Sequence, residues 1–420
     1  MQSSVIAMVI AVCAMICYAT ELIPMPVTAV VSCLAMSITG IISYSAAFSG
    51  FSSDTTMMVI GAMIMGNALF KTGAAQFLGK GLIKLIGNHE KQFIFTVVCL
   101  SAFLSAFLSN TAVVAMMIPV INSVDKRTEG AINVKNCLMC TGYAAVAGGA
   151  CTLVGSTPQL IAQGVLREYG LQEMGFFDLA MSGIPKVIII GLYFMTIGYK
   201  RMQKTFDYNS GVAQVEDDES KVEDPSHAKA VISASIMAFC VIGFVTQIWT
   251  VGTVAMLGGT LCILTGCISL KQALAHMDWG TIIILGGSLG FASGLNSSGA
   301  GLLVANGIIA LMGRGISQWA FYAAITLICI LLGNIMSHTA TSAAMSPIFI
   351  LLAQELGIDP VKTVICMVAA TTISYINPAA TPPITMTMTA GYRFVDYFKV
   401  GWPLQVIMIA YVIITIPVFF

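Results

Sequence analysis

Apolar runs about as long as a lipid bilayer is thick follow one another through most of this sequence. Because a hydrocarbon core about 30 Å thick requires roughly 20 apolar residues per helical span, most runs approach or exceed the length of a membrane helix. Only 9% of the 420 residues are charged and the mean hydropathy is +0.90, which excludes an ordinary soluble domain. The sequence predicts an all-α, polytopic membrane protein with spans near 4–19, 26–43, 56–70, 137–167 (interrupted), 182–199, 230–248, 251–268, 280–295, 361–390 (interrupted) and 401–419.

One polar motif occurs twice within these apolar segments. The sequence LSNTAVVAMMIPV at 108–120 returns as MSHTATSAAMSPI at 336–348, so a Ser-Asn-Thr triplet in the first half corresponds to a Ser-His-Thr triplet in the second. Polar groups are costly in lipid unless they find partners, and two copies therefore indicate one shared site. The surrounding segments, about 92–122 and 318–352, are too long for one helix and too interrupted for two full spans. Each is predicted to form a re-entrant helical hairpin with the triplet at its tip.

The repeat extends well beyond the triplets. Residues 57–82 align with 282–308, and the dipeptide Thr157-Pro158 pairs with Thr381-Pro382, all at a nearly constant separation. Each half then holds about five spans, one of them broken, plus one hairpin, and an odd number of spans brings the second copy into the membrane from the opposite side. Such inverted repeats are common in secondary transporters. The predicted domains are a first inverted repeat over 1–200, a cytoplasmic linker over 201–229 and a second inverted repeat over 230–420.

The basic residues give the orientation. If 71–91 is cytoplasmic, so are the segments near 124–136, 200–229, 269–277 and 391–400, and together they hold 15 of the 19 Lys and Arg residues. This excess obeys the positive-inside rule and predicts a multi-pass protein of the cell membrane with both termini outside. The four basic residues left over are Arg167, Lys186, Arg314 and Lys362.

Charge is expected to be absent from the middle of the membrane. The acidic residues, including Asp54 and Asp278, fall at or beyond the predicted span ends, and no Lys or Arg is expected near the midplane. A proton relay of buried carboxylates is therefore disfavoured. An anionic substrate would have to be held by neutral groups, by helix N-termini and by a bound cation.

Two interrupted helices supply groups of that kind. Glycines, hydroxyls and proline break the apolar pattern at 148–159 and again at 374–386. Unwound carbonyls suit a hard cation such as Na⁺, and helix N-termini suit a carboxylate. Taken singly, each motif equally fits a kinked helix whose Ser and Thr bond to carbonyls one turn back. Four motifs paired by inverted symmetry favour a polar chamber at the centre.

The sequence contains no motif that indicates redox chemistry, a metal site or an enzyme. The 12 cysteines are scattered through apolar spans, and the C-x-x-C spacing of Cys137 and Cys140 is not followed by a second pair, so they are interpreted as small buried hydrophobes. Neither a Gly-x-Ser-x-Gly elbow nor a His-Glu-x-x-His motif occurs. We therefore expect a transporter and not an enzyme, with no organic cofactor and no nucleic-acid partner.

These motifs together resemble the divalent anion/sodium symporter family, which carries dicarboxylates, tricarboxylates or sulfate. The resemblance rests on the two triplets, on TELIPMPVTA at 20–29, on the G-G-x-x-T-L-V-G-x-T-P run at 148–158 and on N-P-A-A-T-P-P at 377–383, and it spans essentially the whole chain. It implies Na⁺ as the coupling ion, a small anionic substrate, and a homodimer in the lipid bilayer whose mobile transport domain moves against a scaffold as an elevator.

The resemblance also implies site residues. The first Na⁺ site would use Ser105, Ser109 and Asn110 with carbonyls near Ser156, and the second would use Ser337 and His338 with carbonyls near Ala380. The substrate would contact Asn110, Thr111, Thr157, Pro158, His338, Thr339, Thr381 and Pro382.

The chain departs from the family pattern at three places. His338 replaces a second Asn, Gly333 stands where a hydroxyl would mirror Ser105, and Gln159 and Ile384 replace the Asn expected after each Thr-Pro segment. His338 is either a neutral substitute for Asn or a proton carrier, because imidazole titrates near neutral pH. The favoured function is sodium-coupled uptake of succinate, malate, fumarate, citrate or sulfate. A sodium-independent or proton-coupled anion exchanger and a metal-citrate or arsenite-type carrier stay open.

Overall fold

The computed structural model describes residues 2–74, 89–128, 131–206, 227–312 and 315–419, and these residues form helices joined by turns and irregular stretches. In the first half the elements are α1 (Gln2–Thr20), α2 (Met25–Ile38), α3 (Tyr44–Phe48), η1 (Ser49–Ser52), α4 (Asp54–Lys71), α6 (Glu90–Ser105), α7 (Asn110–Arg127), α8 (Val134–Gly149), α9 (Thr157–Glu168), α10 (Ala180–Met195) and α11 (Ile197–Thr205). In the second half they are α12 (His227–Thr246), α13 (Val251–Leu264), α14 (Leu270–Ala275), α15 (Trp279–Ser298), α16 (Ala300–Met312), α17 (Gln318–Ile335), α18 (His338–Glu355), α19 (Pro360–Thr371), η2 (Pro378–Ala380), α20 (Pro382–Met386), η3 (Thr387–Ala390) and α21 (Phe394–Phe419).

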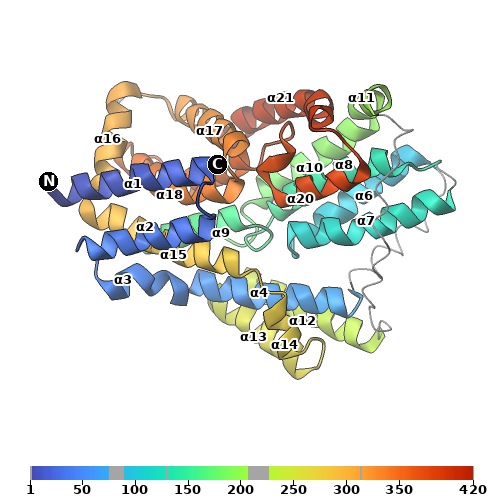
Figure 1. Cartoon of the computed structure of the whole chain (residues 1–420), viewed down its shortest axis with the longest axis horizontal. Coiled ribbons are helices and arrows are strands. Elements are labelled where there is room, and N and C mark those ends of the chain that lie inside the picture. The colour runs from blue at the N-terminus through green and yellow to red at the C-terminus, as the bar shows by residue number, and fades with distance from the viewer. Residues whose placement is uncertain (1, 75–88, 129–130, 207–226, 313–314, 420) are drawn as a thin grey trace.

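Two helix pairs, each joining the two halves of the chain, pack backbone against backbone. α4 lies along α13 and α2 lies along α15 (Figure 1). A Cβ added to Gly61 of α4 would lie only 2.6 Å from the backbone nitrogen of Met256, and one added to Gly287 of α15 would lie 2.7 Å from the carbonyl carbon of Ala29. Small residues permit this close approach, which membrane proteins use because lipid offers no hydrophobic driving force between helices.

The triplet segments each form two helices joined by a short turn. α6 ends at Ser105 and α7 begins after Ser109, whose side chain accepts a hydrogen bond from the backbone N–H of Ala112 at 3.2 Å. In the second half Ser337 caps α18 in the same way, with the N–H of Ala340 at 3.1 Å. Serine is favoured here because its hydroxyl satisfies one of the N–H groups that a helix start leaves unpaired.

The interrupted helices carry polar side chains that satisfy the freed backbone groups. Between α8 and α9, the amide of Gln159 donates to the carbonyls of Gly149 and Thr152 at 2.8 and 3.0 Å. After α19, Gln405 donates to the carbonyl of Ile373 at 3.0 Å, and it accepts from the N–H of Tyr375 at 2.8 Å. Irregular backbone is tolerated inside a membrane protein only where such partners exist.

Two details differ from the expected spans. The expected span over 182–199 is divided into α10 and α11, which meet at a 52° bend. Thr196 leaves the helical conformation there, with φ −121° and ψ −94°, and its hydroxyl donates to the carbonyl of Leu192 at 2.6 Å. The helix α16 was not expected as a separate element; it follows α15 because Gly299 adopts a positive φ of 69° that ends α15.

The helices vary in their capacity to cross a bilayer. Among the described residues, α1, α12, α17 and α21 are each long and apolar enough to span a membrane, and the bent pair of α10 and α11 makes a fifth span if it is taken as one. The apolar helices α2, α13 and α19 are shorter, with 12 to 14 residues each.

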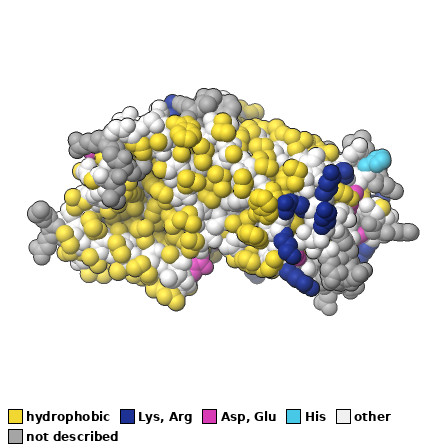
Figure 2. Space-filling view, turned by 90° about the horizontal axis from the view of Figure 1, so that it is seen from above, with side chains coloured by type: hydrophobic (Ala, Val, Ile, Leu, Met, Phe, Trp, Pro, Cys, Tyr) yellow, Lys and Arg dark blue, Asp and Glu magenta, His cyan; other side chains and the backbone are white. Residues whose placement is uncertain are grey.

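The outer surface is suited to lipid. Figure 2 shows a broad hydrophobic face, with Lys and Arg side chains gathered toward one end of the molecule. Four basic residues, Lys200, Arg201, Lys204 and Lys399, line a shallow hollow formed by α11 and α21. An apolar belt that ends in basic residues is typical of a membrane protein whose basic end faces the cytoplasm.

Candidate substrate and cation site

A cavity of about 430 Å³ lies where both triplets and both interrupted helices meet. All eight residues expected to bind substrate line it: Asn110, Thr111, Thr157, Pro158, His338, Thr339, Thr381 and Pro382. Four of the residues expected to bind cations, Ser109, Ser156, Ser337 and Ala380, line it as well, whereas Ser105 is fully buried behind it. The remaining wall is largely α4, which contributes Met58, Val59, Ala62, Met63, Gly66, Asn67 and Phe70.

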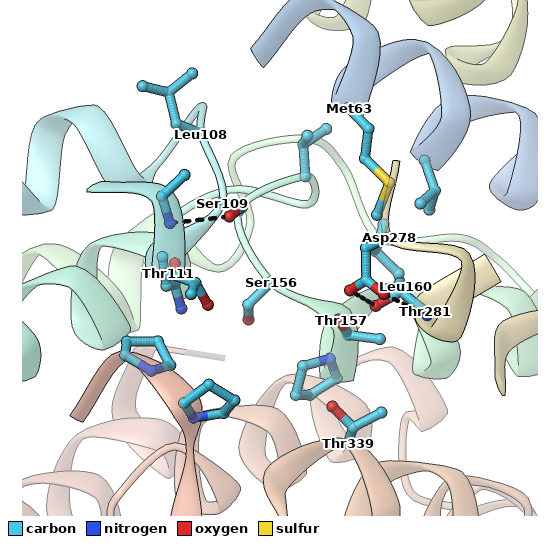
Figure 3. Close-up of a pocket in the computed structure, with 18 of the residues that line it drawn as sticks. Met63, Leu108, Ser109, Thr111, Ser156, Thr157, Leu160, Asp278, Thr281 and Thr339 are labelled. Carbon is cyan, nitrogen blue, oxygen red and sulfur yellow. Dashed lines mark hydrogen bonds between the residues drawn. The ribbon is translucent and has the colours of Figure 1, made fainter. Parts of the chain in front are cut away.

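Three of the helices that begin at this cavity start at a triplet or at the first interruption. Asn110 is the first residue of α7, Thr157 of α9 and His338 of α18. In Figure 3, Ser109, Thr111 and Ser156 lie on one side of the space, and Thr157 and Thr339 lie on another. Each helix start carries unpaired N–H groups and roughly half a positive charge, so the cavity offers donors to an anion at these helix starts.

The Asn110 side chain is the centre of a cluster of polar atoms. Its amide lies 2.6 Å from Ser105 Oγ, 3.2 Å from the carbonyl oxygen of Ala145 and 3.0 Å from that of Gly155. Without an ion, these contacts are satisfied when the amide nitrogen faces them. In the opposite orientation, Asn110 Oδ1 completes a group of four oxygens, which is the neutral ligand set that suits a hard monovalent cation.

Gly149 makes room for this cluster. A Cβ at this position would lie 2.8 Å from both Cγ and Nδ2 of Asn110, and closer still to Oδ1. The expected first cation site is therefore partly assembled: Ser105 and Asn110 meet, and the carbonyl beside them belongs to Gly155 rather than Ser156. The Ser109 hydroxyl is engaged as the cap of α7.

The second triplet is arranged differently. His338 is buried, and its Nε2 lies 2.7 Å from Ser374 Oγ. The Ser337 hydroxyl caps α18 and contacts Met25 Sδ at 3.0 Å. A side chain at Gly333 would lie 2.8 Å from the carbonyl oxygen of Thr371, so the space that would hold a mirror of Ser105 is closed.

Two charged residues lie where the sequence analysis did not expect them. Asp278 lines the cavity, where its carboxylate caps α15 by accepting from the N–H and hydroxyl of Thr281 at 3.1 and 2.6 Å (Figure 3). Lys186 is buried in α10, and its Nζ donates to the carbonyl of Ala369 at 2.7 Å and to Thr372 Oγ1 at 3.4 Å. Thr372 itself lines the cavity.

The sequence predicted no Lys or Arg near the membrane midplane and gave Lys186 no role, so its burial at the end of α19 was not foreseen. Lys186 falls near the start of its apolar segment, where a lysine normally reaches for the interface. In the structure it instead reaches inward to the end of α19. The only sequence signal was its isolation among apolar residues, in IPKVIII at 184–190.

Side chains that could bind a metal are dispersed among the described residues. No group of three or more His, Cys, Asp or Glu side chains that could hold a metal occurs among them. Cys137 and Cys140 are both free and buried, and the thiol of Cys140 donates to the carbonyl of Cys137 at 2.9 Å.

A helical bundle with an apolar exterior and a cavity at which several helices begin fits a multi-pass membrane transporter. The comparisons agree. The citrate transporter family profile matches residues 15–361, which is most of the chain. The chain therefore belongs to the citrate transporter family, and its resemblance to the divalent anion/sodium symporters is confirmed. It is accordingly a protein of the plasma membrane.

Individual relatives are distant but nearly collinear. A sodium-dependent dicarboxylate transporter, SdcS, of Staphylococcus saprophyticus is 23% identical over 89% of this chain and 77% of its own length. SdcS of Staphylococcus aureus is 24% identical over the same shares, and an uncharacterized transporter of Haemophilus influenzae is 26% identical over 93% of this chain and 86% of its own.

Two solved structures share the fold. The structure of Neisseria gonorrhoeae MtrF matches 91% of this chain and 83% of its own, with a TM-score of 0.63 and 15% identity. The Alcanivorax borkumensis YdaH transporter matches 92% and 88%, with a TM-score of 0.65 and 13% identity.

Proposed function

We propose that this protein is a secondary active transporter that carries a small di- or tricarboxylate, of the succinate, malate, fumarate or citrate type, or sulfate, together with Na⁺. The observation that carries the proposal is the cavity itself, because both triplets, both interrupted helices and three helix N-termini contribute to its wall. An anion would be held by N–H and hydroxyl donors at these starts. The cluster around Asn110 would bind Na⁺ beside it.

The packing of the helices supports an inverted repeat and an alternating-access cycle. The pair of α4 with α13 corresponds to the pair of α15 with α2, and α6 packs on α8 and α10 as α17 packs on α19 and α21. This reciprocity is the pattern that two inverted copies produce. The first repeat would cover 1–200 and the second 230–420, joined by the linker 201–229.

An elevator movement would divide the molecule at the cavity. The group α2, α4, α13 and α15 would be the scaffold, and the re-entrant hairpins and interrupted helices would be the moving part, since α4 forms one wall of the cavity and the substrate residues form another. His276 and Asp278 also line the cavity, next to the basic loop assigned to the cytoplasm, so this arrangement corresponds to the inward-facing state. A homodimer would hold two scaffolds fixed against each other in the bilayer.

The decisive experiment is uptake of labelled succinate, citrate and sulfate into proteoliposomes, with and without an inward Na⁺ gradient, at two pH values. Sodium-driven accumulation of any of these anions would support the proposal. Asn110→Ala should raise the Na⁺ concentration for half-maximal uptake, while Asn67→Ala, a wall residue on α4, serves as a control. Accumulation of none of them, or an Asn110→Ala protein with ordinary sodium dependence, would contradict it.

A second candidate is an anion exchanger that runs without sodium or with protons. The observation in its favour is the second triplet, where His338 bonds to Ser374 and Gly333 supplies no ligand. Uptake that ignores Na⁺ but requires an anion inside the vesicle would establish it. Competition by metal ions for citrate uptake would instead indicate a metal-citrate carrier, which the family match keeps in view.

A further inference from the structure

Lys186 is an ammonium group enclosed by protein. The residue is 1% exposed. Its Nζ donates hydrogen bonds to the carbonyl of Ala369 at 2.7 Å and to Thr372 Oγ1 at 3.4 Å. Among the residues that the structure describes, no carboxylate lies within salt-bridge distance of it. A buried charge without a counter-charge is costly, so its position requires an explanation beyond packing.

The atoms that receive this ammonium belong to the end of a broken helix. Ala369 lies in the last turn of α19, and Thr372 is its C-terminal cap. The last carbonyls of a helix lack intrahelical partners and carry partial negative charge, which makes such an end a cation site. In transporters with broken helices, coupling cations are bound at ends of this kind.

The first half of the chain has a cation-binding cluster at the corresponding place. There the carbonyl of Ala145, in α8, lies beside Ser105 and Asn110. The pairing of Thr157-Pro158 with Thr381-Pro382 sets the register of the two halves. In that register Ala145 corresponds to Ala369, whose carbonyl accepts from Lys186.

The ligands of the first cluster are lost in the second half. The alignment of the two triplets pairs Ser105 with Gly333 and Asn110 with His338. The Ser374 hydroxyl bonds to His338 Nε2 at 2.7 Å. Lys186 also lies close enough to the imidazole to interact with it electrostatically. The second half thus lacks the hydroxyl and amide oxygens of Ser105 and Asn110 at the matching positions, and it has the ammonium group of Lys186 nearby.

We propose that the Lys186 ammonium takes the place of a second coupling cation, so that the protein binds one Na⁺, at the Asn110 cluster, and carries its second positive charge covalently. This rests on the proposed function. The attached charge would support anion binding near the second triplet through Thr372, which lines the cavity. Because it crosses the membrane in both directions of a cycle, it adds nothing to the net charge moved.

The first test counts sodium. The purified wild-type protein, titrated with ²²Na⁺ alone, should bind one ion per chain, and sodium-driven uptake of the accepted anion should show a Hill coefficient of about 1, since that coefficient approaches the number of coupled sites at most. With one Na⁺ per dianion, each cycle moves net negative charge inward, so a vesicle interior made positive with valinomycin and K⁺ should accelerate uptake. Two bound ions and uptake indifferent to voltage would overturn the proposal.

The second test removes the charge. Lys186→Met keeps the length of the side chain and should lower the affinity for the anion about tenfold, the effect of losing one favourable charge at a partly buried helix end. ²²Na⁺ binding at the Asn110 cluster should stay within about twofold of wild type, and Lys186→Arg should restore part of the anion affinity. Lys271→Met, at an exposed position of α14, is the matched control. Wild-type anion affinity in folded Lys186→Met protein would refute the role.

The outcomes separate this inference from the proposed function. If the wild type neither binds ²²Na⁺ nor transports the anions with sodium, the proposed function fails. If it does both with two ions per chain, only the role of Lys186 fails. Should Lys186→Met not fold, the sodium count and the voltage dependence of the wild type decide the question without it.

Discussion

The substitution Gly149→Ala tests the cation cluster without removing any of its ligands. The added methyl group would lie 2.8 Å from Cγ and Nδ2 of Asn110, a separation that Cβ atoms in proteins do not adopt. The Asn110 amide would have to turn away and lose its contacts with Ser105 and the carbonyls of Ala145 and Gly155. Overpacking of this kind costs about 1 to 3 kcal/mol. At about 1.4 kcal/mol per factor of ten, the Na⁺ concentration for half-maximal uptake should rise about 5- to 150-fold.

The assay is sodium-dependent uptake in proteoliposomes, with thermal stability in detergent measured in parallel. Gly66→Ala is the matched control, because Gly66 also lines the cavity but its Cβ would meet only Leu108 Cδ2 at an ordinary 3.6 Å. The double variant Asn110→Ala with Gly149→Ala should be no worse than Asn110→Ala alone, since both act on one cluster. A Gly149→Ala protein with the sodium dependence of the wild type would refute the reasoning.

Two further predictions concern groups around the cavity. His338→Asn should make uptake less dependent on pH if the imidazole carries protons, and an unchanged pH profile of uptake between pH 5 and 8 would reject that role. Asp54→Asn should change the maximal rate of uptake and leave the half-saturating anion concentration unaltered, because Asp54 bonds to Arg167 at 2.9 Å between α4 and the end of α9, across the proposed boundary of the moving part. The pair is partly exposed, so the expected effect is below about 1 kcal/mol, or up to about fivefold in rate; a parallel change in half-saturation would contradict it.

Helix positions follow from the sequence more directly than the ligand sets do. The triplets were predicted to lie at a turn between two helices, and in the structure Ser109 and Ser337 follow that turn as caps of α7 and α18. The glycines and prolines after residue 148 predicted an interruption, and α8 ends at Gly149. The bend at Thr196 was missed, because a single threonine in an apolar run carries no distinct signal.

The sequence predicted which residues line the cavity, but not which backbone carbonyls and long side chains lie beside them. Recurrence of the triplets and Thr-Pro dipeptides brought together the residues that line the cavity. The carbonyl of Ala145 was not foreseen, since a backbone oxygen has no sequence signature. Asp278 lies at a span end as predicted, but its place in the cavity wall was not foreseen, and neither was the burial of Lys186. Sequence position gives distance along a helix but not the direction in which a long side chain reaches.

The backbone seams at Gly61 and Gly287 restrict which parts of the molecule can slide. Two helices that touch through their main chains cannot slide past each other without first separating. The pair of α4 with α13 and the pair of α2 with α15 should therefore each move as a rigid unit. Where α9 meets α15, by contrast, the Leu289 side chain packs over Gly164, and a side chain can change rotamer as the surfaces move. In the proposed elevator movement, α9 would therefore slide along α15 through rotamer changes of Leu289, whereas a bulky residue at Gly61 or Gly287 would push the paired helices apart.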